Sequence, residues 1–217
     1  MRAPYPELQP VFDAATSGRL DVALEHALRV LQTASGPLAL EARRHVGLIY
    51  FNLGDFTSAE PYLDEVARLT NEREAWFVLA MMRTRNNNPK AGEFDFAKAL
   101  AAPEPPAHPD EGRQLTEHFM RFDYMHALAE TWQWERAKVQ LDLLVEAVVA
   151  SPSHGPEFLL SRGLPLLEDL LRAGLMVLEV VPNSDPHGWL NQLRGQLTNT
   201  GRREVDRALI ELRQRVG

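Results

Sequence analysis

The feature that most constrains the fold is a pattern of small and large residues that recurs along the chain. Its period falls in the range of roughly 20 to 50 residues that marks repeat architectures. In the clearest unit, between Leu40 and Asn71, small residues at Gly47 and Ala59 let two antiparallel helices approach closely, and Gly54 makes the turn between them. The pattern positions of this unit are Gly47, Tyr50, Gly54, Phe56, Ala59, Leu63 and Val66.

The second helix of this unit has a start signal of its own. Thr57 and Glu60 have the spacing of a capping box, which predicts that the helix begins there. Pro61 then falls in the first turn, where its missing N–H does least harm. Local chemistry and repeat pattern therefore agree.

The same pattern recurs on both sides of this unit. One period earlier, Gly18 repeats the turn, and one period later Asn86, Asn87 and Asn88 replace it, because asparagine tolerates the left-handed conformation. The earlier unit keeps Asp21, Ala23, Ala27, Val30 and Leu31, and the later one keeps Trp76, Leu79, Ala80, Gly92, Phe96, Ala99 and Leu100.

A proline-rich segment at 101–112 interrupts the pattern, and we expect an extended surface loop there. Helical pattern resumes near Gln114 and continues through Trp134, Ala137, Leu141 and Leu144. Further along, Asp185-Pro186 is typical of an N-cap followed by proline at the first helical position. A turn is expected at 199–201, followed by a last helix that places Val205, Ala208, Leu209 and Leu212 on one face.

These spacings resemble the tetratricopeptide repeat (TPR). The resemblance implies an all-α fold in which antiparallel helical hairpins, about twelve helices in all, stack in a right-handed solenoid. It predicts a single domain over 1–217, with repeats near 4–39, 40–72, 73–100, 113–150, 151–184 and 185–217. A different type of antiparallel helical repeat remains an alternative for the C-terminal half.

The resemblance also selects a binding surface, because TPR proteins line a concave groove with the first helices of successive repeats. The groove would hold an apolar or amphipathic segment of a partner protein, and Met81→Glu would abolish binding without unfolding the chain. The predicted groove residues are Phe12, Arg44, Leu48, Phe51, Phe77, Met81, Arg85, Phe119, Phe122 and His126.

The aromatic stripe has two other interpretations. Aromatic residues at helical spacing also form buried cores, and a homodimer could cover the stripe with a copy of the same chain. Five arginines of the last helix are explained as the polar outer face of a terminal repeat rather than as a basic binding patch. These are Arg202, Arg203, Arg207, Arg213 and Arg215.

Composition excludes several kinds of partner. A net charge of −7 disfavours nucleic acid, because duplex binding depends on Lys and Arg neutralising phosphates. The apolar stretch 164–181 contains four charged residues, so no membrane span is expected. The absence of cysteine excludes thiolate chemistry, and the N-terminal residues lack a signal sequence, which favours the cytoplasm. Few lysines and isoleucines beside many arginines suggest a bacterial chain.

No enzyme motif is present. The sequence contains no GxxxxGK[ST], GxSxG or HExxH, and we expect no cofactor and no catalytic activity. The remote alternative is a metal-dependent enzyme that uses His118, His126 and Glu130, which are spaced on one helix face.

Overall fold

The computed structural model describes residues 3–103 and 115–216, without the side chains of 215 and 216. Within these residues the chain is all-helical, with twelve α-helices, one short 3₁₀ helix and no strand, as the sequence predicts. The chain groups into two compact units, Met1–Pro105 and Pro106–Gly217. A single array over 1–217 remains a prediction, and residues 104–112 of the predicted loop lie outside the described residues.

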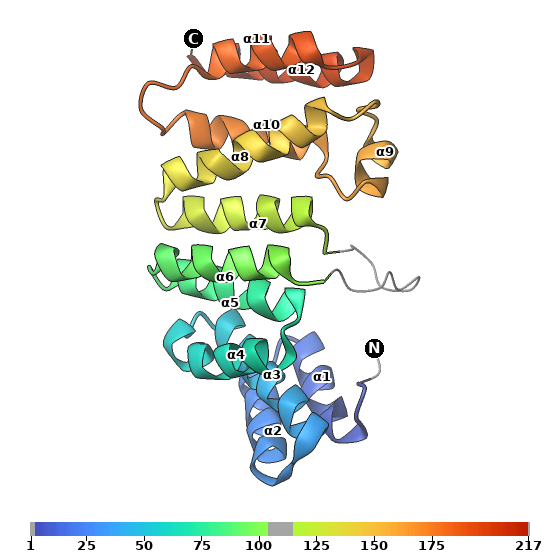
Figure 1. The fold of residues 1–217 in the computed structure, drawn as a ribbon, viewed down its shortest axis with the longest axis vertical. Helices are drawn as coiled ribbons and strands as arrows, with labels where there is room; N and C mark the ends of the chain where they lie inside the picture. Colours follow the sequence, from blue (N-terminus) through green and yellow to red (C-terminus); the bar gives the residue numbers. More distant parts are fainter. Residues whose placement is uncertain (1–2, 104–114, 217) are drawn as a thin grey trace. The chain divides into compact units, whose positions relative to one another are not determined.

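Unit 1 consists of a 3₁₀ helix followed by three helical hairpins (Figure 1). Consecutive helices pack against one another throughout the unit. The elements are η1 (Pro6–Leu8), α1 (Gln9–Thr16), α2 (Leu20–Thr33), α3 (Gly36–Asn52), α4 (Phe56–Thr70), α5 (Arg73–Arg85) and α6 (Pro89–Ala101).

Unit 2 also contains six helices, but one of them is very short. In it α7 packs against α8, α10 packs against α8 and α12, and α11 packs against α12. The helices are α7 (Glu117–Glu130), α8 (Trp134–Val149), α9 (Pro156–Ser161), α10 (Leu167–Leu178), α11 (Pro186–Gln196) and α12 (Asn199–Val216). Each predicted repeat segment thus contains two helices.

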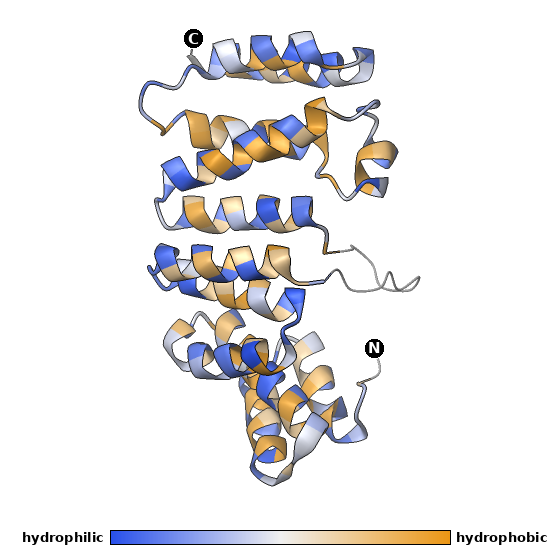
Figure 2. Cartoon of the chain, viewed as in Figure 1, coloured by the Kyte–Doolittle hydropathy of each residue, from blue (hydrophilic) through white to orange (hydrophobic). Residues whose placement is uncertain are grey.

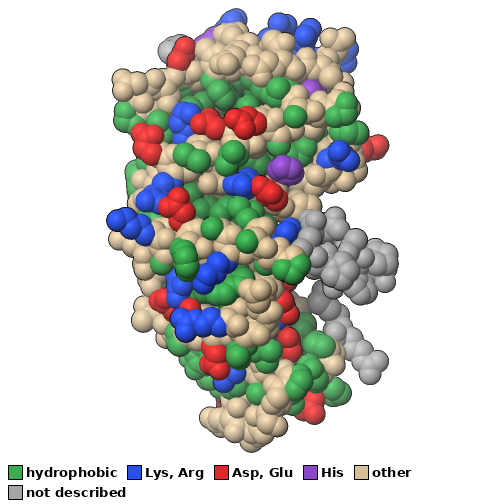
Figure 3. All heavy atoms as spheres, in the orientation of Figure 1, with side chains coloured by type: hydrophobic (Ala, Val, Ile, Leu, Met, Phe, Trp, Pro, Cys, Tyr) green, Lys and Arg blue, Asp and Glu red, His purple; other side chains and the backbone are tan. Residues whose placement is uncertain are grey.

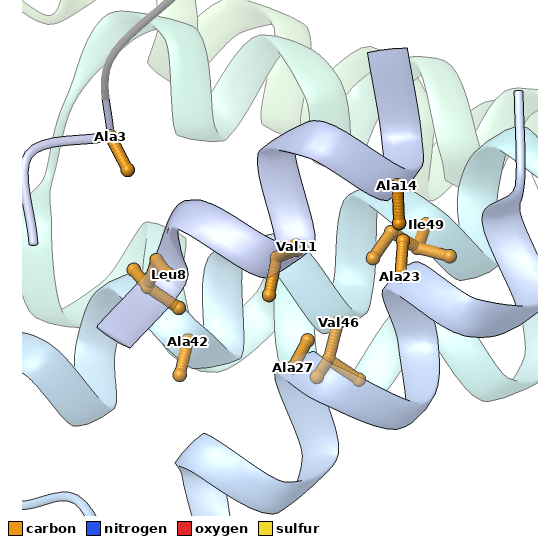
Figure 4. Close-up of a cluster of buried hydrophobic side chains, with 9 residues drawn as sticks. All are labelled: Ala3, Leu8, Val11, Ala14, Ala23, Ala27, Ala42, Val46 and Ile49. Carbon is orange, nitrogen blue, oxygen red and sulfur yellow. The ribbon is translucent and has the colours of Figure 1, made fainter. Parts of the chain in front are cut away.

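Small and branched residues form the hydrophobic core at the start of unit 1. In Figure 4, Ala27 of α2 and Val46 of α3 point toward each other, and Leu8 lies near Ala42. Hydrophobic and hydrophilic residues alternate along the helices (Figure 2), as expected of amphipathic helices. Alanine at the α2 positions lets the helix backbones approach closely, so the core needs few bulky side chains.

Glycine sets the closest helix approaches in unit 1, as the pattern predicts. A Cβ at Gly47 of α3 would lie 2.8 Å from Leu63 Cδ2 of α4. In the next hairpin, a Cβ at Gly92 of α6 would lie 2.1 Å from Thr84 Oγ1 of α5. A side chain at Gly47 would displace Leu63, and one at Gly92 would also press on the backbone of α5, since its Cβ would lie 2.9 Å from the Ala80 carbonyl oxygen.

One turn geometry joins the helices of four hairpins. Its central residue has a positive φ of 74° at Gly18, 77° at Gly54, 58° at Asn87 and 62° at Trp132. At Gly54, for example, its N–H donates to the Phe51 carbonyl at 3.0 Å, and the next N–H donates to the Tyr50 carbonyl at 3.0 Å. The predicted use of glycine and asparagine at these turns is therefore confirmed.

Trp132 is the exception among these turn residues. A bulky side chain in the left-handed region is strained, and this indole is 78 % exposed, with only the edge of Trp134 near it at 5.9 Å between ring centroids. The tight turn between α7 and α8 is formed at this cost.

The helix starts partly match the sequence signals. At α11, Asp185 is the N-cap as predicted, and its Oδ1 accepts from the Gly188 N–H at 2.9 Å. At α4 the prediction of Thr57 was wrong by two residues: Asp55 is the N-cap and accepts from the Ser58 N–H at 3.1 Å. Asp and Thr are both good caps, and the turn after Gly54 determines which one is in position.

The turn expected at 199–201 is wrong, because these residues form the start of α12. The buried His154 holds this helix start. The Thr198 N–H donates to His154 Nδ1 at 3.2 Å, so Nε2 carries the proton that it donates to the Val148 carbonyl at 3.0 Å. Gly201 is helical and lets this turn lie close to His154. The predicted buried face of α12 is confirmed.

Arg83 of α5 forms a partly buried ionic cluster with two neighbouring helices. Its guanidinium contacts Glu60 at 2.9 Å and Asp64 at 2.8 Å on α4, and Asp95 at 2.6 Å on α6. Asp95 is fully buried, and burial raises the pKa of its carboxyl although Arg83 opposes the rise. One cation thus ties the third hairpin to the second.

Relief of the strained turn gives the first test. We expect Trp132→Asn to be more stable than Trp132→Ala by about 1 kcal/mol, because asparagine tolerates the left-handed conformation and alanine does not. Both variants lose the ring contact with Trp134, so the comparison isolates the backbone. Urea denaturation monitored by circular dichroism measures the difference, and equal stabilities would contradict the strain.

Removal of Arg83 gives the second test. Arg83→Met leaves the buried Asp95 without its closest cation, so we expect a loss of about 3–5 kcal/mol. The matched control is Arg68→Met, because the Arg68 side chain is 70 % exposed and pairs with the same Asp64 at 2.8 Å. Its removal should cost less than about 1 kcal/mol. Hydrogen exchange of α4, α5 and α6 measures the stability loss of each variant. Similar losses would contradict the claim that burial of Asp95 makes the Arg83 contacts important.

Candidate functional site

The predicted groove residues of α1 and α3 have partners within unit 1. Phe12 lies edge-on to His45 with the ring centroids 4.8 Å apart, and burial lowers the pKa of this histidine. Arg44 forms two ion pairs, with Glu72 at 2.6 Å and with Glu41 at 3.5 Å. Leu48 is half-buried. These side chains are largely engaged within the unit.

Two further predicted residues meet across α3 and α5. The Arg85 guanidinium lies over the Phe51 ring, 5.4 Å from its centroid, and Phe51 also packs against Phe56 at 5.8 Å. Both residues are half-buried. This cation–π pair is the part of the predicted groove in unit 1 that combines an aromatic side chain with a charge.

Three predicted groove residues lie inside the protein. The exposed fractions of Phe77, Met81 and Phe119 are 7 %, 8 % and 6 %. Phe77 packs against Phe96 of α6, with ring centroids 6.2 Å apart. These three side chains offer almost no surface to a ligand. For the half-buried residues among the predicted groove residues, a role in partner binding remains a prediction.

Phe122 and His126 of α7 lie side by side in unit 2. Their rings form an edge-to-face pair at 4.8 Å, and both are half-buried. Burial lowers the pKa of His118, one of the three residues of the possible metal site. Within residues 3–103 and 115–216, no group of three His, Asp or Glu side chains is arranged to hold a metal ion.

Unit 2 contains an open groove between α8 and α11. It comprises two adjoining hollows of about 740 Å³ and about 590 Å³, which share Lys138, Asp142, Trp189 and Gln192. Apolar residues from α8, α11, the end of α10 and the following segment line it, namely Val139, Val145, Val149, Leu178, Val181, Trp189 and Leu193. We call this surface the α8–α11 groove.

Trp189 positions one wall of the groove. Its indole lies against the backbone of α10, where a Cβ at Gly174 would be 2.6 Å from the ring, while Leu141 of α8 approaches the same point at 3.3 Å. Helices α8, α10 and α11 thus meet at a glycine. The short α9 contributes no residue to the groove walls.

Acidic residues border the α8 side of the groove. Glu135, Asp142 and Glu146 are all exposed, and Lys138 pairs with Asp142 at 2.7 Å. Glu135 and Glu146 form no ion pair within the part of the chain that the structure describes. On the face of the molecule that Figure 3 shows, acidic side chains lie among hydrophobic ones. The groove therefore combines an apolar floor with a negative edge.

Sequence reasoning missed this groove. Its signals were weak: the prolines at 156 and 165 confine α9 to a short segment, and α8 carries Val139, which is 54 % exposed, on its charged side. Neither feature shows which helix will lie opposite. The second wall of the groove comes from α11, whose Trp189 lies against Gly174 of α10.

Comparisons with known proteins identify no family for this chain. No protein-family model matches the chain, and no curated protein matches it. Among the described residues, no helix is both long and apolar enough to cross a membrane. The TPR resemblance therefore remains a prediction from the sequence pattern.

The burial of Met81 changes the expected effect of a charge there. We now expect Met81→Glu to destabilise the fold by on the order of 3 kcal/mol, because it buries a carboxylate without a partner. Leu69→Glu on α4 is the control, since Leu69 is 64 % exposed and should lose little stability. Urea denaturation measures the free energy of unfolding of both variants. Equal stabilities would contradict the burial of Met81.

Proposed function

We propose that this chain is a protein–protein interaction module that binds an amphipathic helical segment in the α8–α11 groove. The open, apolar and acid-edged groove of unit 2 is the observation that carries the proposal. The proposal keeps the kind of ligand that the sequence suggested and moves its site from the first-helix faces to this groove. A TPR-like array of hairpins would be its scaffold.

The groove's shape and chemistry favour a helix as ligand. A helix with its side chains is about 10–12 Å wide and presents an apolar stripe along one side. Val139, Val149 and Trp189 offer apolar surface to such a stripe, while Glu135 and Glu146 lie where its polar residues would emerge. Helix-in-groove binding of this kind uses residues at i, i+4 and i+7 as anchors.

A photo-crosslinking amino acid at residue 139 tests the proposal directly. We expect residue 139 to crosslink to a helical segment of another protein molecule, and mass spectrometry of the crosslinked peptide identifies that segment. The control position is residue 160 on α9, because Leu160 is 50 % exposed, close to the 54 % of Val139, and lies outside the groove. Crosslinks from both positions alike, or none from residue 139, would refute the proposal.

A substitution in the groove gives an independent measure. Val139→Glu adds a charge to the apolar surface and should weaken binding of the crosslinked segment about tenfold or more, whereas Leu160→Glu should leave it unchanged. Both positions are exposed, so neither variant should unfold the protein.

A further inference from the structure

An exposed stripe of side chains runs along α8 at the edge of the α8–α11 groove. Its members are Glu135, Val139, Asp142 and Glu146, at spacings that place them on one line along the helix. All four are exposed, and the opposite side of α8 packs into unit 2 through Ala137, Leu141, Leu144 and Val148. The stripe is therefore acidic, with one apolar residue within it.

A second exposed stripe runs along α12 and has the opposite charge. Its members are Arg203, Arg207, Ile210 and Gln214. Ile210 is 56 % exposed, although it is a large aliphatic residue. Val205, Leu209 and Leu212 on the other side hold α12 against the rest of unit 2, so this stripe points outward.

The two stripes match when the helices are antiparallel. From Glu146 back to Glu135, and from Arg203 forward to Gln214, the spacings are the same: 0, 4, 7 and 11 residues. This register sets Arg203 opposite Glu146, Arg207 opposite Asp142, Ile210 opposite Val139 and Gln214 opposite Glu135. The parallel alternative sets Ile210 opposite Asp142 and Arg207 opposite Val139, which would leave the apolar residues unmatched.

Resting on the proposed function, we infer that the groove's occupant is α12 of a second copy of this chain. Ile210 of one molecule packs on Val139 of the other, and arginines flank it against the acidic edge. The existing pairs Lys138–Asp142 and Arg207–Glu204, at 2.7 Å and 2.9 Å, each link an exposed residue to a half-buried one on the same helix. Such pairs contribute little stability, so they give way easily to the intermolecular ones.

The interface joins two different surfaces, α8 of one molecule and α12 of the other. Two molecules can exchange these contacts reciprocally in a closed isologous dimer, or each can bind the next head to tail in a heterologous series. In either case one molecule needs an intact α8 stripe and the other an intact α12 stripe. This requirement permits a complementation test.

The test uses the full chain with charge reversals on one stripe at a time. Sedimentation velocity over a concentration series should show that the wild type self-associates and that salt weakens the association. Asp142→Arg with Glu146→Arg, and separately Arg203→Glu with Arg207→Glu, should each raise the dissociation constant about tenfold or more. The control, Glu74→Arg with Glu157→Arg, makes the same charge change as the α8 variant at exposed positions outside both stripes and should associate like the wild type.

Mixing the two reversed proteins then tests the register. Each should be monomeric alone, but the mixture pairs an intact α12 with an intact α8 and should form a one-to-one complex. Combining all four reversals in one chain should restore self-association, because both stripes change sign together.

The outcomes separate this inference from the proposed function. A wild type that stays monomeric, a control that dissociates like the stripe variants, or a mixture that stays monomeric would overturn the inference. If the wild type is monomeric while residue 139 crosslinks to a helix of a different protein, the groove's function stands and only the second copy is wrong. If residue 139 crosslinks to nothing, both are wrong.

Discussion

The left-handed residue between two helices is the constraint on which four hairpins depend, three in unit 1 and the α7–α8 hairpin in unit 2. Its backbone geometry reverses the chain in very few residues, so the following helix must lie antiparallel to the first. Close packing then requires small residues where the helices meet, as at Gly47 and Gly92. At Trp132 the turn forms although the side chain is unsuited to it. The geometry is therefore imposed by the packing of α7 on α8 rather than by the preference of the turn residue.

Local signals in the sequence predicted the parts of the fold that depend on neighbouring residues. Gly54 and Asp185 act within a few residues of themselves, so their roles could be recognised without the rest of the chain. The turn expected at Gly201 failed for the opposite reason. That glycine serves a contact with His154, 47 positions earlier in the chain, and no local pattern distinguishes a packing glycine from a turn glycine. At α4 the helix start was predicted at Thr57, only two residues after the observed N-cap Asp55, because the capping signal is local.

The candidate site could not be predicted because exposure depends on which helices become neighbours. Phe77 and Met81 have the spacing of a ligand-binding stripe, but a buried core produces the same spacing. The opposite error affects the α8–α11 groove. In the sequence, Val139 is an isolated apolar residue on a charged helix face, but in the structure it lines a groove whose other wall is α11. Only the placement of α11 beside α8 shows that Val139 belongs to a groove, and the sequence of α8 alone carries no signal for that placement.

Two helices of unit 2 present exposed side chains of opposite charge. The stripe of α8 is acidic and the stripe of α12 is basic. Charged residues on an outer helix face need no partner, because water solvates them. Solvation alone does not explain an exposed Ile210 in the α12 stripe, nor a spacing that the α8 stripe repeats in reverse. Complementary surfaces on one molecule are what a heterologous interface between copies requires.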